Sequence, residues 1–278
     1  MEVIKTIAEL RRRLAREPRV ACVPTMGNIH DGHLRLVGIA HEHAPLVVTT
    51  IFVNRMQFTG GEDFERYPRT FAEDCEKLAA QGVHIVFHPD DTQMYPQAQT
   101  FVVEPPPIAN KLEGRFRPGH FRGMATVVLK LFNIVQPQVA VFGKKDYQQL
   151  HIVQHMVEQL ALPVQIVAAE TRRADDGLAL SSRNRYLSEA ERREATRLHQ
   201  VLNQVKSVVE QGDRNFEALE FAADAELARH GWRVDYVVVR RRATLTAPEP
   251  GDRELVALGA AKLGETRLID NLEITARA

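Results

Sequence analysis

Short apolar runs alternate with amphipathic segments through the N-terminal part of the chain, and this alternation limits the folds that it can adopt. Residues 46–53 (Leu-Val-Val-Thr-Thr-Ile-Phe-Val) are rich in β-branched side chains, which is typical of a strand covered on both faces. We expect further strands at residues 19–23, 83–87, 139–142 and 164–167, and helices at residues 71–80, 124–135 and 147–160. These β-α units predict an α/β fold with a doubly wound, Rossmann-like parallel sheet, whose ligands bind beyond the carboxyl ends of the strands. The polar residues that directly follow predicted strands are His30, Asn54, Gln57 and Lys145.

Residues 24–33 (Pro-Thr-Met-Gly-Asn-Ile-His-Asp-Gly-His) lead from a predicted strand into a predicted helix. Free amide groups and the positive end of the helix dipole make such a helix start a natural phosphate site. The imidazoles of His30 and His33 can donate to phosphate oxygens, and Gly32 lets a ligand approach the backbone closely. The alternative is a pair of surface histidines in a turn that happens to contain glycine, and the motif alone leaves it open.

Residues 142–149 (Phe-Gly-Lys-Lys-Asp-Tyr-Gln-Gln) form a second predicted turn from strand to helix. Gly143 allows close approach to a ribose or base, Lys145 can reach a phosphate, and Asp146 can accept from ribose hydroxyls. Alternatively, Asp146 is a helix N-cap and Lys145 a solvated charge. Because the turn lies at the same predicted sheet edge as His30, we prefer the binding interpretation.

Residues 176–185 (Asp-Gly-Leu-Ala-Leu-Ser-Ser-Arg-Asn-Arg) lie near the expected domain junction. The hydroxyls of Ser181 and Ser182 and the guanidinium of Arg183 suit a mobile loop that closes over phosphates. An ordinary Ser-rich linker is the alternative. Other nearby arginines indicate that part of this charge is a solvated helix face.

A long loop is expected at residues 89–119, because the three prolines at 105–107 exclude a continuous helix. It leads into residues 115–123 (Arg-Phe-Arg-Pro-Gly-His-Phe-Arg-Gly), which form either an anion-binding flap or a solvated linker. Long loops in compact domains are often functional, so we prefer the flap.

The pattern changes after about Thr171. A capping box at Ser188 and Glu191 predicts a long helix that runs to about Gln211, and a second helix is expected at residues 216–229. Strand-like runs follow at residues 234–240, 255–258 and 266–274. We therefore expect a Rossmann-like domain over residues 1–171 and a smaller C-terminal α+β domain over residues 172–278.

The charge balance and the cysteines exclude some classes of protein. Lys plus Arg and Asp plus Glu number 36 each, which argues against a surface that coats nucleic acid, although a local basic cleft is still allowed. The sequence has no apolar run of membrane-spanning length. Cys22 and Cys75 are the only cysteines, and Cys22 lies in a predicted buried strand, so a disulfide framework or zinc cluster is not expected. The bulk properties favour a reduced, cytoplasmic enzyme.

Taken together, these segments resemble the pantothenate synthetase (pantoate–β-alanine ligase) family of the nucleotidylyltransferase superfamily. The His-x-Gly-His turn is shared across that superfamily and with class I aminoacyl-tRNA synthetases, so it indicates no single substrate. The segments Lys-Asp-Tyr-Gln-Gln and Ser-Ser-Arg-Asn, together with Gln57, are more particular. The resemblance is collinear over nearly the whole chain and also includes residues 24–27, 51–54, 57–58, 67–70, 119–123, 145–149, 177–184 and 267–271.

The resemblance implies a two-step ligation. Pantoate carboxylate attacks the α-phosphate of ATP to give pantoyl adenylate and pyrophosphate, and the amine of β-alanine then attacks the acyl carbon to give pantothenate and AMP. Mg²⁺ is expected to arrive with ATP, because it usually keeps several waters and uses few protein ligands. Asp74 is a candidate for an outer contact to this ion. The resemblance also implies a homodimer through the larger domain and a C-terminal domain that acts as a lid.

The resemblance assigns roles to residues of each segment. The phosphates would be held by His30, His33, Lys145, Ser181, Ser182 and Arg183, with His33 as the donor to the pentavalent transition state. ATP would also be contacted by Met26, Gly27, Asn28, Ile29, Asp31, Gly32, Gly143, Lys144, Asp146, Arg172 and Leu180. Among these, Gly143 and Asp146 would take the ribose, and the backbone at Arg172 to Arg173 and at Leu180 would edge the adenine pocket. Pantoate would be bound by Gln57, Gln149 and Met26, and β-alanine would be placed by Asn54 and Gln57.

Three positions depart from the family pattern. Arg55 replaces a usual proline, Lys144 stands where an acidic residue is common, and Arg172 where a small or aliphatic residue is usual. Two other functions stay open at this point. A nucleotidylyltransferase acting on a phosphorylated alcohol would keep both histidines but would need a phosphate-binding acceptor pocket in place of Gln57 and Gln149. A non-catalytic nucleotide-sensing module would be expected to have lost part of the phosphate-binding set.

Overall fold

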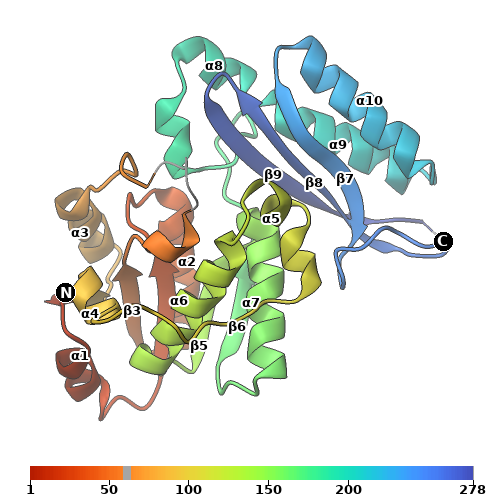
Figure 1. The fold of residues 1–278 in the computed structure, drawn as a ribbon. Coiled ribbons are helices and arrows are strands. Elements are labelled where there is room, and N and C mark those ends of the chain that lie inside the picture. Colours follow the sequence, from red (N-terminus) through yellow and green to blue (C-terminus); the bar gives the residue numbers. More distant parts are fainter. Residues whose placement is uncertain (59–63, 278) are drawn as a thin grey trace. The chain divides into compact units, whose positions relative to one another are not determined.

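The computed structural model describes residues 1–58 and 64–277 (Figure 1). The chain forms two compact units. The first comprises Met1–Lys144 and Gln148–Glu170, and the second comprises Lys145–Tyr147 and Thr171–Ala278. The short segment Lys145–Tyr147 therefore belongs with the C-terminal part of the chain, although it lies in the middle of the N-terminal sequence.

The first unit contains a parallel sheet with the strand order β1-β4-β3-β2-β5-β6. The strands are β1 (Glu2–Ile4), β2 (Val20–Thr25), β3 (Leu46–Ile51), β4 (Ile85–Phe87), β5 (Val139–Gly143) and β6 (Gln165–Ala169). All six residues of β3 are buried, as expected for a strand covered on both faces. The prediction of a doubly wound parallel sheet is confirmed; β1 was not among the predicted strands.

Helices cover both faces of this sheet (Figure 1). They are α1 (Ile7–Leu14), α2 (Asp31–His43), α3 (Phe71–Ala80), α6 (His120–Val135) and α7 (Tyr147–Gln159). Val37 and Ala40 of α2 and Leu78 of α3 pack in one core. Leu10 of α1 and Leu131 of α6 pack in the other. The apolar side chains that these helices bury recur at helical spacing, which allowed all of them except α1 to be predicted from the sequence.

The segment expected to be a long loop contains short helices. These are α4 (Asp91–Met94), η2 (Pro107–Asn110) and α5 (Glu113–Phe116). The buried Gln148 amide orders the last two by donating to the carbonyls of Ile108 (2.8 Å) and Lys111 (3.0 Å) and accepting from the amide of Glu113 (3.0 Å). Because these bonds come from a residue distant in sequence, local patterns did not reveal them.

The second unit is a smaller α+β structure, as predicted. Its antiparallel sheet consists of β7 (Arg233–Arg241), β8 (Glu254–Leu263) and β9 (Thr266–Thr275). Its helices are η4 (Ser182–Tyr186), α8 (Glu189–Glu194), α9 (Arg197–Glu210) and α10 (Phe216–Arg229). A Cβ added at Gly259 of β8 would lie 2.9 Å from a Leu198 methyl, so α9 packs closely on the sheet.

The predicted long helix after Ser188 is interrupted. The capping box of Ser188 and Glu191 is present, but α8 ends at Glu194 and α9 begins at Arg197. The Thr196 hydroxyl donates to the carbonyl of Arg193 (3.1 Å), a local bond that competes with helix continuation. The prediction of one continuous helix was therefore wrong.

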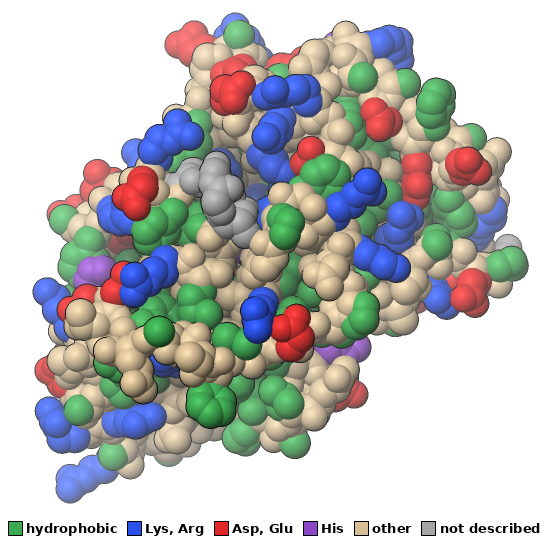
Figure 2. Space-filling model, in the orientation of Figure 1, with side chains coloured by type: hydrophobic (Ala, Val, Ile, Leu, Met, Phe, Trp, Pro, Cys, Tyr) green, Lys and Arg blue, Asp and Glu red, His purple; other side chains and the backbone are tan. Residues whose placement is uncertain are grey.

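Within the described residues, no helix combines the length and apolarity needed to cross a membrane. On the face seen in Figure 2, Lys and Arg side chains lie among Asp and Glu side chains. This mixed distribution agrees with the equal counts of the two signs in the sequence.

Candidate functional site

The turn from β2 into α2 depends on a buried carboxylate of α3. Gly27 and Asn28 have φ angles of 86° and 52°, in the left-handed region that lets the chain reverse before the helix. Asp74, 1% exposed, accepts the amide of Asn28 on Oδ2 (2.8 Å) and the amide of Ile29 on Oδ1 (2.7 Å). Its Oδ1 also accepts the Thr70 hydroxyl at 3.0 Å. The carboxylate therefore satisfies donors that a left-handed turn exposes.

Lys77, one turn further along α3, holds the same turn from its carbonyl side. Its Nζ donates to the carbonyl oxygen of Ile29 at 2.9 Å. Ile29 is 1% exposed, so its side chain is part of the core and both of its backbone polar groups are bonded to α3. Asp74 and Ile29 thus take supporting positions beneath the turn, while Asp31 at the first position of α2 is exposed.

The two histidines of the turn are locked in one tautomer by backbone amides. His30 is the N-cap of α2, and its Nδ1 accepts the amide of Gly32 at 3.1 Å. The Nδ1 of His33 lies 3.4 Å from the amide of His30 in the reciprocal half of the capping box. The rings stack, with centroids 4.1 Å apart. Because both Nδ1 atoms act as acceptors, each neutral ring carries its proton on Nε2, where it can donate to an anion.

Gln57 is presented by the short helix η1 (Arg55–Gln57), which follows β3. Its Nε2 lies 2.9 Å from Met26 Sδ, and its Oε1 accepts Asn54 Nδ2 at 3.2 Å. Asn54 also donates to the carbonyl of Gly123 (3.2 Å) and accepts from the hydroxyl of Tyr95 (2.6 Å) and the amide of Met56 (3.3 Å). The Asn54 amide is thus engaged on both its oxygen and its nitrogen, and it orients Gln57.

Helix α6 supports η1 from below. His120 Nδ1 lies 2.7 Å from the carbonyl oxygen of Gln57. A Cβ added at Gly123 would lie 1.9 Å from the carbonyl oxygen of Met56, so only glycine allows this backbone contact. Residues 119–123 therefore begin a buried helix, with Gly119 as N-cap. Residues 115–123, expected to form a flap or a linker, thus span the end of α5 and the start of α6, and anion binding by this segment stays a prediction.

A cavity of about 250 Å³ opens beside the turn in the first unit. It is lined by residues that follow β2 and β3 and by the start of α3, among them Met26, Gly27, Val53, Thr70 and Asp74. Most of this lining is apolar, which suits an aliphatic group with a few polar anchors nearby.

The third strand end holds the remaining first-unit residues. Gly143 does not require left-handed backbone, and a Cβ there would meet only a Leu36 methyl at 3.9 Å, so the fold itself does not demand glycine. Lys144 pairs with Glu170 at 2.5 Å, which balances the extra positive charge at this position. The half-buried Gln149 side chain has no hydrogen-bond partner within the described part of the chain and is available to a ligand.

The other phosphate candidates lie in the second unit. Ser181 is the N-cap of η4 and accepts the amide of Arg183 at 3.2 Å, while its hydroxyl proton can still be donated. Asn184 Nδ2 donates to the carbonyl of Ala179 at 3.0 Å. Residues 181–184 therefore have a defined conformation. The neighbouring candidates Leu180 and Ser182 are half-buried, and Lys145, Asp146 and Arg172 complete the second-unit set.

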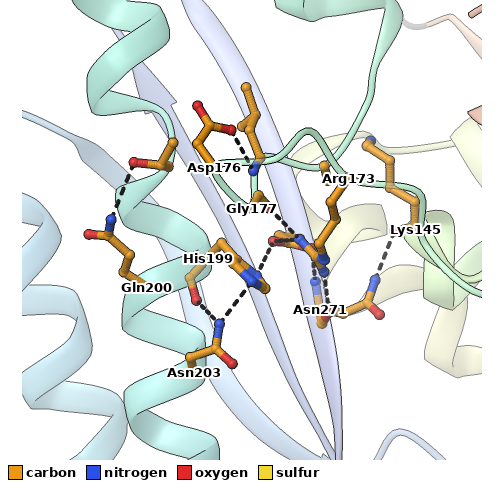
Figure 3. Close-up of polar contacts among 12 residues, drawn as sticks. Lys145, Arg173, Asp176, Gly177, His199, Gln200, Asn203 and Asn271 are labelled. Carbon is orange, nitrogen blue, oxygen red and sulfur yellow. Dashed lines mark hydrogen bonds and ion pairs between the residues drawn. The ribbon is translucent and has the colours of Figure 1, made fainter. Parts of the chain in front are cut away.

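A buried ion pair fixes the base of that loop. Arg173 donates to both carboxylate oxygens of Asp270, at 2.7 and 2.8 Å, and His199 Nδ1 lies 3.3 Å from Oδ2. Burial opposes ionisation of Asp270, but the hydrogen bonds from His199 and Arg173 outweigh it and lower the pKa of this carboxyl. Asn203 in turn contacts His199 Nε2 at 2.9 Å (Figure 3). Asp270 is therefore a buried carboxylate with two side-chain partners, Arg173 and His199.

Several residues that shape these segments were not assigned a role from the sequence. They are Lys77, His120, Arg173 as an ion-pair partner, Asp270 and Asn271. The run at residues 267–271 was part of the family resemblance, and that was the signal available for Asp270 and Asn271. Nothing in local spacing indicated which segments these side chains contact.

The chain matches the family described as pantoate-beta-alanine ligase over residues 2–273. A pantothenate synthetase of Nitrosospira multiformis is 62% identical over 275 residues, covering 99% of each chain. A pantothenate synthetase of Chromobacterium violaceum is 56% identical with the same coverage.

Solved structures show the same similarity. A pantothenate synthetase from Thermus thermophilus superposes with a TM-score of 0.93 at 42% identity, covering 99% of this chain and 100% of that one. A pantoate-beta-alanine ligase from Francisella tularensis, in complex with beta-gamma ATP and beta-alanine, superposes with a TM-score of 0.81 at 30% identity and covers 98% of this chain and 97% of that one.

Proposed function

This chain belongs to the pantoate–β-alanine ligase family, and we propose how its residues carry out the reaction. It is an ATP-dependent ligase that joins pantoate and β-alanine to form pantothenate. In the proposed course, a pantoate carboxylate oxygen attacks the α-phosphorus of ATP and the bond to the β-phosphate breaks. Pyrophosphate leaves, and a mixed anhydride, pantoyl adenylate, remains.

The first step needs positioning and neutralisation of charge more than a protein nucleophile. The observation that carries this proposal is the pair of imidazoles whose Nδ1 atoms are occupied by the capping box of α2. Their Nε2–H groups are thereby aimed away from the helix backbone as donors. We assign His33 to the oxyanion that develops at the α-phosphorus and His30 to the adjacent phosphate oxygens.

Residues of the second unit supply further donors for the phosphates. Lys145 contributes a cation, Ser181 and Ser182 contribute hydroxyls, and Arg183 contributes a planar fork suited to phosphate. Gly143 and Asp146 take the ribose, and the backbone at Arg172 and Leu180 edges the adenine. The pairing of Lys144 with Glu170 neutralises the positive charge of Lys144 beside the nucleotide.

The second step releases AMP. The amine of β-alanine attacks the acyl carbon, the bond between that carbon and the phosphate oxygen breaks, and the nitrogen loses a proton. Gln57 and Gln149 hold the pantoate hydroxyls, and Met26 contacts its methyl groups. The cavity that Met26 lines supports the contact between Met26 and those methyl groups, because its lining is largely apolar. Asn54 acts by orienting Gln57, since both ends of its amide are already engaged.

Mg²⁺ is proposed to enter with ATP and to be held mainly by phosphate oxygens and water. It would neutralise charge on the leaving pyrophosphate. The oxygens of Asp74 are engaged by Thr70 and two backbone amides, so this carboxylate is better suited to ordering the turn than to facing the ion.

We also propose a homodimer formed through the larger unit, a cytoplasmic location, and two domains at residues 1–171 and 172–278. The first unit exposes Phe101 (90%) and Phe116 (41%), and aromatic side chains are enriched at interfaces. Light scattering on the purified protein tests the dimer, and limited proteolysis near residue 171 tests the domain boundary.

The proposed cytoplasmic location is supported by the two free cysteines, Cys22 and Cys75, which suit a reducing compartment.

The proposed reaction is tested with purified protein, ATP, Mg²⁺, D-pantoate and β-alanine. AMP and pyrophosphate should accumulate only when both organic substrates are present, and exchange of labelled pyrophosphate into ATP should need pantoate alone. Release of AMP without pantoate, or none with all components, would contradict the assignment.

The role of His33 is tested by His33→Ala, which should reduce kcat for pyrophosphate exchange by about 10² to 10³-fold, as for loss of one preorganised donor. The variant should fold, because His30 still caps α2. A variant that keeps most of its exchange activity would refute the role.

A further inference from the structure

Side chains bond the segment that carries Lys145 to strand β9, and Figure 3 shows the bond from Asn271. Asn271 Nδ2 donates to the main-chain carbonyl of Lys145 at 2.9 Å. Two residues further along each segment, the Tyr147 hydroxyl donates to Glu273 Oε1 at 2.8 Å. These bonds link residues 126 apart in sequence, and they join the segment to the second unit.

Asn271 is itself rigidly placed. It is 6% exposed, and its backbone pairs with Leu258 in the sheet. Its backbone amide donates to Asp270 Oδ1 at 2.8 Å, and its backbone carbonyl accepts from the Arg173 guanidinium at 3.2 Å. Arg173 also donates to both carboxylate oxygens of Asp270. The Asn271 side chain, which donates to Lys145, is therefore held in place by a buried, charged network.

The ammonium of a lysine is carried on a flexible four-carbon stem. The region that the ammonium reaches is therefore defined only when the backbone of the residue is fixed. Lys145 lies in the short helix η3 (Lys144–Asp146), directly before α7. A bond to its carbonyl fixes the plane of the peptide that follows and therefore the direction in which the side chain leaves the backbone.

We propose that Asn271 is a positioning residue for the ligation, acting through Lys145. The inference rests on the phosphate-binding role proposed above for Lys145. Asn271 does not touch the substrates in this scheme. It holds the lysine backbone in the place from which the ammonium reaches the phosphates, and Tyr147 provides a second tether to the same strand.

The test is a double-mutant cycle with Lys145→Ala, Asn271→Ala and the double variant, measured by pyrophosphate exchange. In the wild-type background, Asn271→Ala should lower kcat about 10- to 100-fold, since a displacement of about 1 Å costs up to about 10². The KM for ATP should change much less. In the Lys145→Ala background, the same substitution should have less than about a 3-fold effect, because its target is gone.

Equal effects of Asn271→Ala in both backgrounds would reveal a general structural role and overturn the inference. An unchanged kcat in Asn271→Ala would overturn it as well. If Lys145→Ala alone retains full activity, the role proposed for Lys145 fails, and that result is distinct from a failure of the coupling. Gln200→Ala, which alters an exposed residue of α9, is the matched control and should leave both kcat and the melting temperature unchanged.

Should Asn271→Ala fail to fold, Tyr147→Phe decides the question. It removes one hydroxyl at a half-buried position and keeps the ring. A smaller loss of kcat, about 3- to 10-fold, should appear with Lys145 present and vanish with Lys145→Ala. A loss of the same size in both backgrounds would overturn the inference.

Discussion

Asp74 is the residue on which the geometry of the His30 turn most depends. Two consecutive left-handed residues expose amides that no helix or strand can pair, and a single buried carboxylate takes up the amides of Asn28 and Ile29. A Cβ at Gly27 would lie 3.1 Å from Asp74 Oδ2, so glycine and carboxylate fit together closely. The two histidines that we propose for catalysis therefore depend on a side chain that need not contact the substrate.

Replacing Asp74 with alanine should lower the free energy of unfolding by about 3 kcal/mol, because one buried and one part-buried backbone amide lose their acceptor. Urea denaturation measures this, and pyrophosphate exchange should fall with it. Glu73→Ala, at the exposed neighbouring position, is the control and should change stability by less than about 0.5 kcal/mol. Equal stability of the two variants would refute the role of the carboxylate.

At the scale of elements, the contact between α6 and η1 sets the position of Gln57. Gly123 of α6 touches the backbone of Met56, and His120 reaches the carbonyl of Gln57. Helix α6 thus holds the short helix η1 that carries Gln57, the residue we propose to bind pantoate.

This contact gives a prediction with an unusual sign. Exchanging a helical glycine for alanine normally stabilises a protein by about 1 kcal/mol. Gly123→Ala should instead destabilise it by about 2–3 kcal/mol, because the new methyl overlaps a backbone carbonyl, and the KM for pantoate should rise as Gln57 shifts. Thermal unfolding and steady-state kinetics measure the two effects.

The control for that variant is Gly119→Ala, where a Cβ meets nothing within 4 Å and only the left-handed backbone resists. It should cost about 1–2 kcal/mol and leave the KM for pantoate unchanged. If the Gly123→Ala protein is more stable than the wild type, the contact between Gly123 and the backbone of Met56 is not tight enough to exclude a methyl group.

Elements whose apolar residues recur with a clear helical or strand period could be predicted from the sequence. Elements held by hydrogen bonds from residues distant in sequence could not. Residues 71–80 and 216–229 were predicted as helices and are α3 and α10 to the residue. The short helices near Ile108 depend on bonds from Gln148, which no local pattern contains. The strand ends that carry His30, Gln57 and Lys145 followed from the alternation of elements, but the tautomers and tethers of these residues did not.

For the whole molecule, buried histidine contributes a pH dependence of stability. Burial, and to a lesser extent the neighbouring His155, lowers the pKa of His151 to about 4. The unfolded chain, with a pKa near 6.5, therefore takes up this proton first as the pH falls. The stability that the neutral ring contributes is fully present above about pH 6.5 and is lost progressively down to about pH 4.

Titration of His151 alone should lower the free energy of unfolding by about 3 kcal/mol as the pH falls over that interval, at roughly 1.4 kcal/mol per pH unit. Urea unfolding at a series of pH values measures the slope, and His151→Gln should flatten it. A steep slope that persists in His151→Gln would assign the effect to other groups.

The order of the strands also has a consequence for the ribosome-bound chain. Strand β2 lies between β3 and β5, yet it ends at Thr25 while β5 begins only at Val139. At about 5–20 residues per second, several seconds of synthesis pass before that second neighbour exists. During this interval the side of β2 that later pairs with β5 has no strand partner. The yield of the protein in a cell should therefore depend on how fast the segment between β2 and β5 is translated.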